Sequence, residues 1–220
     1  MRLPHVDLNM NDFKDKEVLF LGAHPDDIEI GCFGVISLLS ILGCNITFCI
    51  CTSEGIRKDE IDKSVEDLKK NGINIQNNYM LDFKDTKLYE KKSELKDKLS
   101  EIFSDKKIDF IFTHSRNDLH QDHRLVAEIT LELFRGPNIF AYEIPKFDGN
   151  SFKPSLYFGL NHQIVQKKVD HLMTHYKSQQ RKIWYRPSTF EATMSLRGVE
   201  SGKYFAEGFE VIKYILGEHQ

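Results

Sequence analysis

A histidine and two aspartates lie together in the segment His24-Pro25-Asp26-Asp27. Neutral imidazole and carboxylate oxygen are both good ligands for zinc and related metals. A histidine and an aspartate three positions apart, here His24 and Asp27, can chelate one ion from a tight turn. The remaining carboxylate, Asp26, is then free to act on a bound water molecule. An aspartate that caps a following helix would account for one of these acids but not for the whole group.

A second group of ionisable residues is the segment His120-Gln121-Asp122-His123. One of its histidines can bind a metal ion while the other faces a substrate. Asp122 can hold an imidazole in a fixed orientation and keep it protonated. A charged helix start with Asp122 as its cap explains that aspartate alone and leaves the two histidines unexplained.

Together the two groups supply three metal ligands, His24, Asp27 and His123. A fourth position would stay open for water, which is typical of catalytic rather than structural zinc sites. Asp26 then remains as a general base, and His120 remains as a general acid or oxyanion donor. This combination predicts metal-assisted hydrolysis. The residues alone leave amide, ester and phosphoester substrates open, and they suit zinc, iron, cobalt or manganese.

Short apolar runs alternate with helical patterns along most of the chain. Five runs have the length and composition of buried strands, namely residues 17–22, 45–52, 73–81, 108–113 and 138–144. Four segments between them carry apolar residues at helical spacing, namely residues 28–42, 59–70, 89–103 and 122–134. Strands separated by helices predict parallel pairing, and hence a doubly wound α/β sheet flanked by helices. Ligands bind such sheets at the carboxyl ends of the strands, where both groups of ionisable residues fall.

The pattern changes after Pro145. We expect a loop that walls the site, then a long helix, an irregular segment and a closing strand, over residues 146–160, 161–182, 184–202 and 204–216 respectively. No repeat or Pro/Ser-rich linker divides the sequence. We therefore expect one domain over residues 1–220, with a core over residues 17–145.

The composition is that of a globular chain without a large basic surface. Among 220 residues, Lys and Arg number 30 and Asp and Glu number 33, which gives a formal net charge of −3. This balance argues against nucleic-acid binding driven by charge. No apolar run reaches the roughly 18–20 residues of a transmembrane helix, and the N-terminal residues lack a signal-peptide stretch. We expect the four cysteines to be buried and reduced, in agreement with a cytoplasmic location.

The segments Gly22-Ala23-His24-Pro25-Asp26-Asp27 and His120-Gln121-Asp122-His123 resemble the signature of the LmbE-like (PIG-L) family of zinc-dependent de-N-acetylases. The similarity extends over about residues 17–212. Ile28 and Gln121 replace the Glu and Pro that family members often have, and neither change removes a ligand or a proton carrier. The resemblance implies a Rossmann-like, mostly parallel doubly wound sheet. It also implies a zinc cofactor and a small-molecule substrate, an N-acetylated amino sugar or its conjugate.

The resemblance implies a role for each residue of the two segments. His24, Asp27 and His123 would bind zinc, with Fe2+ or Co2+ as alternative metals. Asp26 would be the general base for a zinc-activated water molecule that attacks the acetamide carbonyl. His120 would stabilise the oxyanion or protonate the leaving amine.

Three further residues complete the predicted site. Asp122 would orient His120, and Arg57 would contact the sugar or its aglycone. Glu143, at the end of a strand on the functional edge, is a second candidate for substrate binding.

The sequence also allows interpretations other than a de-N-acetylase. A zinc hydrolase of the same fold acting on a different N-acyl amide has the same signature, as does a non-catalytic metal-binding homologue. His114 and Asp118 can either support the metal ligands or stabilise their loop. At His171 and His175 we expect a helix face of mixed exposure rather than a second metal site. The sequence leaves the sugar and the oligomeric state open, including a homo-oligomer.

Overall fold

The computed structural model describes residues 10–146 and 152–215. Its central element is a seven-stranded sheet with the strand order β3-β2-β1-β4-β5-β7-β6. The strands are β1 (Glu17–Gly22), β2 (Asn45–Thr52), β3 (Ile75–Phe83), β4 (Phe110–His114), β5 (Asn138–Tyr142), β6 (Leu156–Leu160) and β7 (Phe205–Lys213). Strands β1 to β5 are parallel, which confirms the predicted doubly wound, mostly parallel α/β sheet.

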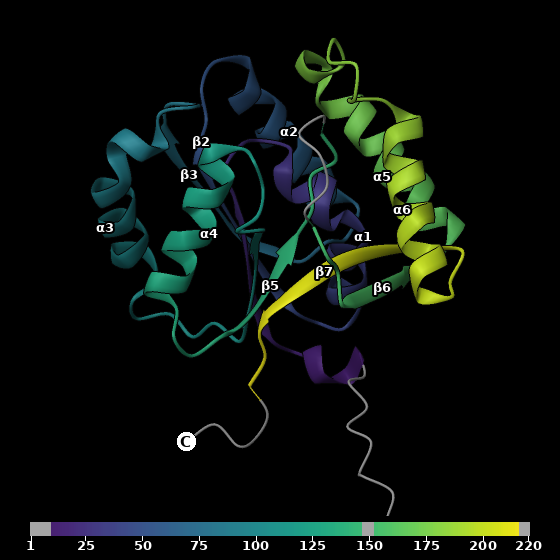
Figure 1. Cartoon of the computed structure of the whole chain (residues 1–220), viewed down its shortest axis with the longest axis horizontal. Coiled ribbons are helices and arrows are strands. Elements are labelled where there is room, and N and C mark those ends of the chain that lie inside the picture. Colours follow the sequence, from purple (N-terminus) through teal and green to yellow (C-terminus); the bar gives the residue numbers. More distant parts are fainter. Residues whose placement is uncertain (1–9, 147–151, 216–220) are drawn as a thin grey trace, which may run out of the picture.

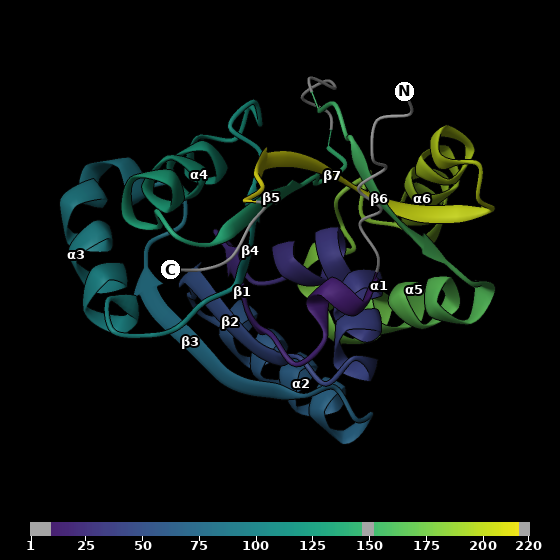
Figure 2. The same cartoon turned by 90° about the horizontal axis from the view of Figure 1, so that it is seen from below.

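Helices cover both faces of this sheet. They are α1 (Asp27–Ile41), α2 (Ile56–Lys70), α3 (Lys92–Phe103), α4 (Gln121–Leu133), α5 (His162–His175) and α6 (Pro187–Ser201). Figure 1 shows α3 and α4 together at one side of the molecule and α5 and α6 at the other. Seen from below in Figure 2, α3 and α4 lie on one side of the sheet, and α1, α2 and α5 lie on the other. Within the described ranges, no helix is long and apolar enough to cross a membrane.

Alternate residues of each central strand enter two separate cores. In β1, Val18 and Phe20 pack with residues of α1, α2, α5 and α6, whereas Leu19 and Leu21 pack with residues of α3 and α4. Because both faces are covered, the strands read as continuous apolar runs in the sequence. All four cysteines are buried and free, as expected.

The C-terminal part of the chain differs from the prediction in two places. The closing strand is confirmed as β7, but it runs antiparallel and lies between β5 and β6. The prediction of a loop over residues 146–160 is wrong at its end, because β6 forms there as an edge strand paired with β7. Residues 147–151 of that loop and Leu216 of the expected strand lie outside the described residues.

The prediction of an irregular segment over residues 184–202 is also wrong, because α6 occupies most of it. Its boundaries follow ordinary helix signals, with Pro187 in the first turn and Gly202 just after the end at φ 69°. The helix expected over residues 161–182 is shorter. Helix α5 ends at His175 and is followed by a 3-10 turn over Lys177–Gln179.

A buried ion pair joins α5 to β7, and its carboxylate also binds α1. Nζ of Lys168, in α5, lies 2.7 Å from Oε1 of Glu207, in β7, and both side chains are almost fully buried. Glu207 also accepts the backbone N–H groups of Gly34 and Val35 in α1, each at 2.8 Å. One carboxylate thereby fixes α1 and α5 against the sheet.

Candidate metal centre

The sequence-predicted residues meet at the carboxyl ends of β1 and β4. These two strands are neighbours in the sheet although they are far apart in the sequence. The segment 24–27 follows β1 directly, and the loop after β4 leads into the first turn of α4. The crossover from β1 leads to one side of the sheet and that from β4 to the other. This reversal is where doubly wound folds bind their ligands.

Three acceptor atoms converge at this point. Nδ1 of His24 lies 3.1 Å from Oδ2 of Asp27 and 3.2 Å from Nε2 of His123. Nε2 of His123 lies 3.4 Å from Oδ2 of Asp27. We call these three atoms, His24 Nδ1, Asp27 Oδ2 and His123 Nε2, the acceptor triangle. All three side chains are buried.

Carboxylates hold the opposite nitrogen of each imidazole. Nε2 of His24 lies 2.9 Å from Oδ1 of Asp85 and 3.3 Å from Oδ2 of Asp122. Nδ1 of His123 lies 2.7 Å from Oδ2 of Asp118. Asp122 accepts the Nε2–H of His24, and Asp118 accepts the Nδ1–H of His123. The lone pairs of both rings therefore point into the triangle.

These residues fit a divalent metal ion. Ligand bonds of about 2.0–2.2 Å in a tetrahedron separate neighbouring ligand atoms by about 3.3–3.6 Å, close to the three observed distances. Three acceptors without a proton between them repel one another unless a cation lies among them. In this structure the ammonium group of Lys146 already approaches the triangle, with Nζ 3.2 Å from His123 Nε2.

His114 packs against the metal-binding residues without being a ligand itself. Its Nε2 accepts the backbone N–H of Ala23 at 2.9 Å, which uses the lone pair that a metal would need. Its ring stacks on that of His123, with the centroids 3.9 Å apart. Burial lowers the pKa of His114 to about 3, so the ring is neutral and can pack tightly against its neighbour.

His120 caps α4 and presents its other nitrogen to the site. Its Nδ1 accepts the backbone N–H of Asp122 at 3.3 Å, so the neutral ring carries its proton on Nε2. The ring centroid lies 4.8 Å from that of His24. Burial, together with nearby His123 and His24, lowers the pKa of His120 to about 4. A neutral N–H donor therefore lies beside the candidate metal ligands.

Asp26 adopts an unusual backbone conformation at the start of α1. Its φ of 97° is left-handed, which costs an aspartate on the order of 1–3 kcal/mol and is common at functional sites. Arg57 holds the side chain, with Nη2 2.9 Å from Asp26 Oδ1, and also donates to the carbonyl oxygen of Pro25. Burial raises the pKa of Asp26 to about 6, and the charge of Arg57 opposes that rise.

A cavity of about 540 Å³ opens over these groups. It is lined by His24, Asp26, Asp27, Arg57, Asp85, Leu119, His120, Lys146, Lys182, Ile183 and Trp184. The cavity has room for a sugar-sized ligand, with an indole, two lysines and two of the three candidate metal ligands, His24 and Asp27, around it.

The structure brings seven of the eight predicted site residues together. Asp122 belongs to the centre, but its carboxylate contacts His24 and the backbone N–H of Thr86 rather than the His120 ring that we expected it to orient. Asp118, left open between two roles, is the partner of His123.

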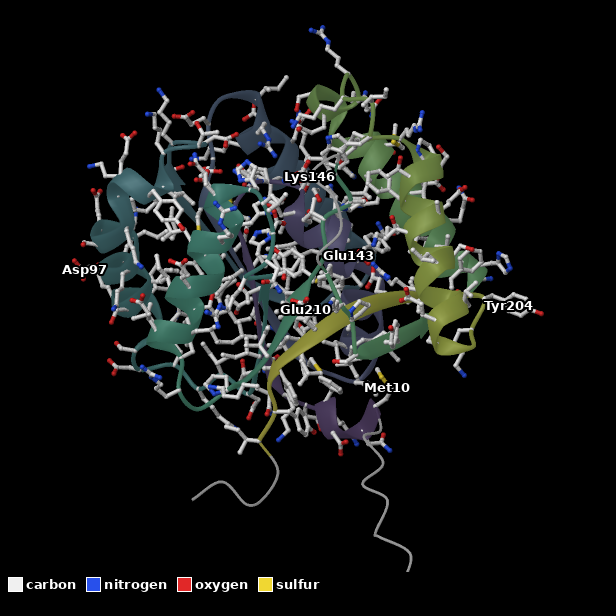
Figure 3. All side chains as sticks on the ribbon, viewed as in Figure 1. Met10, Asp97, Glu143, Lys146, Tyr204 and Glu210 are labelled. Carbon is white, nitrogen blue, oxygen red and sulfur yellow. The ribbon has the colours of Figure 1, made fainter. Side chains whose placement is uncertain are left out.

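Glu143 is the eighth predicted residue and lies elsewhere. It lines a neighbouring cavity of about 250 Å³, which Leu119 and Lys146 share with the first. Both of its oxygens are bound by Arg197, at 2.6 and 2.7 Å. Figure 3 shows Glu143 and Lys146 between the α4 side and the α6 side of the molecule. Its role in substrate binding stays a prediction.

Sequence reasoning missed Asp85, Lys146, Lys182 and Trp184. Asp85 follows β3, so the rule that ligands bind at the carboxyl ends of strands could have identified it. Lys146 likewise follows β5. Lys182 and Trp184 lie between α5 and α6 and have no such signal in the sequence.

The fold and these side chains are those of an α/β protein with a His/Asp/His centre beside a buried carboxylate. The chain belongs to the PIG-L family, described as GlcNAc-PI de-N-acetylase, whose family model matches residues 19–134, more than half of the sequence. The match includes every residue of the acceptor triangle and ends before Glu143.

Individual relatives agree with this family. The uncharacterized deacetylase YaiS of Escherichia coli (strain K12) is 29% identical over 171 residues, which cover 74% of this chain and 91% of YaiS. The N,N'-diacetylchitobiose deacetylase of Pyrococcus horikoshii superposes with a TM-score of 0.75 at 20% identity, covering 94% of this chain and 87% of that one.

A second similar structure has a different activity. GalB, the 4-carboxy-2-hydroxymuconate hydratase of Pseudomonas putida KT2440, has a TM-score of 0.70 at 16% identity, covering 93% of this chain and 99% of that one. Such likenesses show the fold, and this one shows that the fold also hosts a reaction other than deacetylation. The reaction must therefore be argued from the site.

Proposed function

We propose that this protein is a zinc-dependent hydrolase that removes the N-acetyl group from an amino sugar or an amino-sugar conjugate. His24, Asp27 and His123 would hold the metal. The observation that carries the proposal is the triangle of lone pairs from these side chains, with the outer imidazole nitrogens held by carboxylates. Membership of a deacetylase family supports the reaction class.

A bound divalent metal would supply Lewis acidity, which lowers the pKa of water and polarises a carbonyl group. Asp26 is the proton acceptor for the attacking water. Arg57 holds one of its oxygens, and its carboxylate lines the cavity. Asp26 then passes the proton to the leaving amine, so that acetate and a free amine are released.

His120 acts as a hydrogen-bond donor to the carbonyl oxygen. Its Nδ1 is occupied by the Asp122 N–H, so Nε2 carries the proton that is offered to the developing negative charge. Asp122 and Asp85 position His24, and Asp118 positions His123. Because these contacts already hold the rings in place, little reorganisation is needed when the charge develops.

The cavity lining supports a sugar substrate. Trp184 offers an aromatic surface of the kind on which sugar rings stack, and Arg57 and Lys182 offer donors for hydroxyl or anionic groups. The relatives support the same class, since one is a diacetylchitobiose deacetylase. We place the protein in the cytoplasm, in line with its composition and its reduced cysteines.

The test is release of acetate and free amine from a panel of N-acetylated sugars, their conjugates and simple N-acyl amides. We expect activity that is lost on chelation and restored by zinc. Asp26→Asn should lower kcat by about 10²–10⁴-fold while the bound metal is retained. Asp15→Asn is the matched control, because Asp15 also has a positive φ, of 56°, and is exposed before β1.

Three results would contradict the proposal. Full activity of Asp26→Asn would remove the general base from the mechanism. Turnover of simple N-acyl amides alone would keep the hydrolase mechanism and overturn the amino-sugar assignment, whereas no turnover by the zinc-loaded protein would favour a non-catalytic role.

A further inference from the structure

A second cluster of metal-ligating side chains lies between α2 and α5. Asp67 comes from α2, whereas His171 and His175 come from successive turns of α5. The two helices pack against each other beside the sheet. None of these residues belongs to the candidate metal centre or lines its cavity.

The cluster converges on one carboxylate oxygen. Oδ2 of Asp67 lies 3.3 Å from Nδ1 of His171 and 3.2 Å from Nε2 of His175. The two imidazole centroids are 4.5 Å apart. Asn71 donates to the other oxygen, Oδ1, at 3.2 Å, which leaves Oδ2 facing the rings. Three potential ligand atoms thus lie within 4.8 Å of one another.

A chain of hydrogen bonds fixes the tautomer of His171. The hydroxyl group of Ser64 donates to Oε1 of Glu29 at 2.6 Å. The oxygen of Ser64 therefore accepts a hydrogen bond from the Nε2–H of His171, with the two atoms 2.7 Å apart. Tyr176 donates to the same oxygen of Glu29, at 2.5 Å, so this carboxylate is anchored from two sides. His171 is left with a lone pair on Nδ1.

This lone pair faces the carboxylate of Asp67 at 3.3 Å, and two acceptors in such contact need a positive charge between them. Protonation of His171 would place an imidazolium on a side chain that is 4% exposed, which desolvation disfavours. A metal ion avoids this cost because it binds the neutral ring. Ser64, which accepts the Nε2–H, holds the ring as carboxylate, carbonyl or water acceptors hold metal-binding histidines elsewhere.

We propose that Asp67, His171 and His175 form a second divalent-metal site that clamps α5 to α2. Two imidazoles and one carboxylate suit Zn2+, Co2+, Ni2+ or Cu2+ rather than Mg2+ or Ca2+. The side chains of Asp67 and His175 are 42% and 14% exposed, so water can complete the coordination from solvent. Because the ligands come from two helices, a bound ion stabilises their packing.

The test counts metal ions bound by the full chain. Metal-free protein is dialysed to equilibrium against Zn2+, and bound zinc is measured by atomic emission. We expect two equivalents for the wild type and one fewer for His175→Gln and for Asp67→Asn. His162→Gln, at the exposed start of the same helix, is the matched control and should bind as many ions as the wild type.

The candidate metal centre is tested separately by the same measurement. If that centre fails to bind zinc, the wild type binds one equivalent, which is lost in His175→Gln. The second site is overturned if His175→Gln and Asp67→Asn bind as much zinc as the wild type. The rise in Tm on addition of zinc should be smaller for each variant than for the wild type, each protein being compared with its own metal-free form.

A second measurement does not depend on the variants. Crystals of the zinc-loaded wild type should give an anomalous scattering peak between Asp67, His171 and His175. A peak at the candidate metal centre without one here would overturn the proposal.

Discussion

Replacement of Asp118 by Asn should weaken metal binding at the candidate metal centre, because both carboxylate oxygens of Asp118 accept hydrogen bonds. Oδ1 accepts the backbone N–H of His120, and Oδ2 accepts the Nδ1–H of His123, each at 2.7 Å. Asparagine has one carbonyl oxygen and can serve only one of these donors. Either the His120 N–H loses its acceptor, or His123 meets an NH2 group and moves its proton to Nε2, its metal-binding atom.

The expected loss of zinc affinity follows from the negative charge of Asp118, the partner of His123. Although burial opposes ionisation, the hydrogen bonds that Asp118 accepts from His123 and from the backbone N–H of His120 help to lower its pKa to about 2. A hydrogen bond to a charged group contributes about 1.5–3 kcal/mol. Removing the partner of a metal-binding histidine typically costs about 10–100-fold in affinity, or about 1.4–2.7 kcal/mol. Since the two ranges agree, we expect the Kd for zinc to rise by about 10–100-fold.

The assay is a zinc titration in competition with a chromophoric chelator. It is done in a His175→Gln background, so that only the candidate metal centre is measured. Asp109→Asn is the matched control, because Asp109 is also buried, and its Oδ2 accepts the N–H of Glu17 at 2.9 Å. Asp109 precedes β4, at the amino ends of the parallel strands and so away from the candidate metal centre. The single carbonyl oxygen of asparagine can replace its contact with Glu17. The zinc affinity of this control should match that of the background.

An Asp118→Asn affinity within twofold of the control would refute the reasoning, provided that both proteins are folded. It would mean that the orientation of His123 does not depend on the carboxylate, or that His123 is not a ligand.

The remaining predictions concern the oxyanion donor and the packing beneath the site. His120→Gln should lower kcat by about 10²–10³-fold without changing the number of bound metal ions, and loss of a metal ion would instead make His120 a ligand. Lys168→Met should lower the free energy of unfolding in urea by about 3–5 kcal/mol, because Glu207 is left as a buried, unpaired charge, and a loss below 1 kcal/mol would contradict this. Gly31→Ala should lower the free energy of unfolding by about 1–3 kcal/mol, because a Cβ at this position would lie 2.3 Å from Cδ2 of Tyr142. An unchanged urea midpoint would show that the Tyr142 ring moves aside freely.

The central sheet could be predicted because its strands are buried on both faces. Runs such as 17–22 and 45–52 are short, apolar and separated by amphipathic helices, so local pattern and tertiary structure agree. The edge strand β6 contains Gly159 and follows Pro154, which in sequence resemble a loop, and it becomes a strand only through pairing with β7. Its formation depends on a segment far away in the chain.

The candidate metal centre likewise has residues that the sequence could predict and residues that it could not. Its ligands could be identified because His24 and Asp27 share one turn and His123 lies in a second dense cluster. The partners Asp85 and Asp122 could not be assigned to His24, since that contact depends on how β3 and α4 pack beside β1. The sequence could not pair Asp67 with His171 and His175 for the same reason, because α5 meets α2 only in the folded chain.

The pairing of β1 with β4 also has a consequence for the order of folding events. The acceptor triangle takes two side chains from the segment after β1 and one from the start of α4, and the intervening chain must close as a long loop before they meet. Such non-local parallel pairing forms slowly. During refolding, metal uptake at the candidate metal centre would therefore report the moment at which the middle of the sheet closes. A mutation that delays the docking of β4 would delay uptake equally, whereas one that delays only β6 or α6 would leave its rate unchanged.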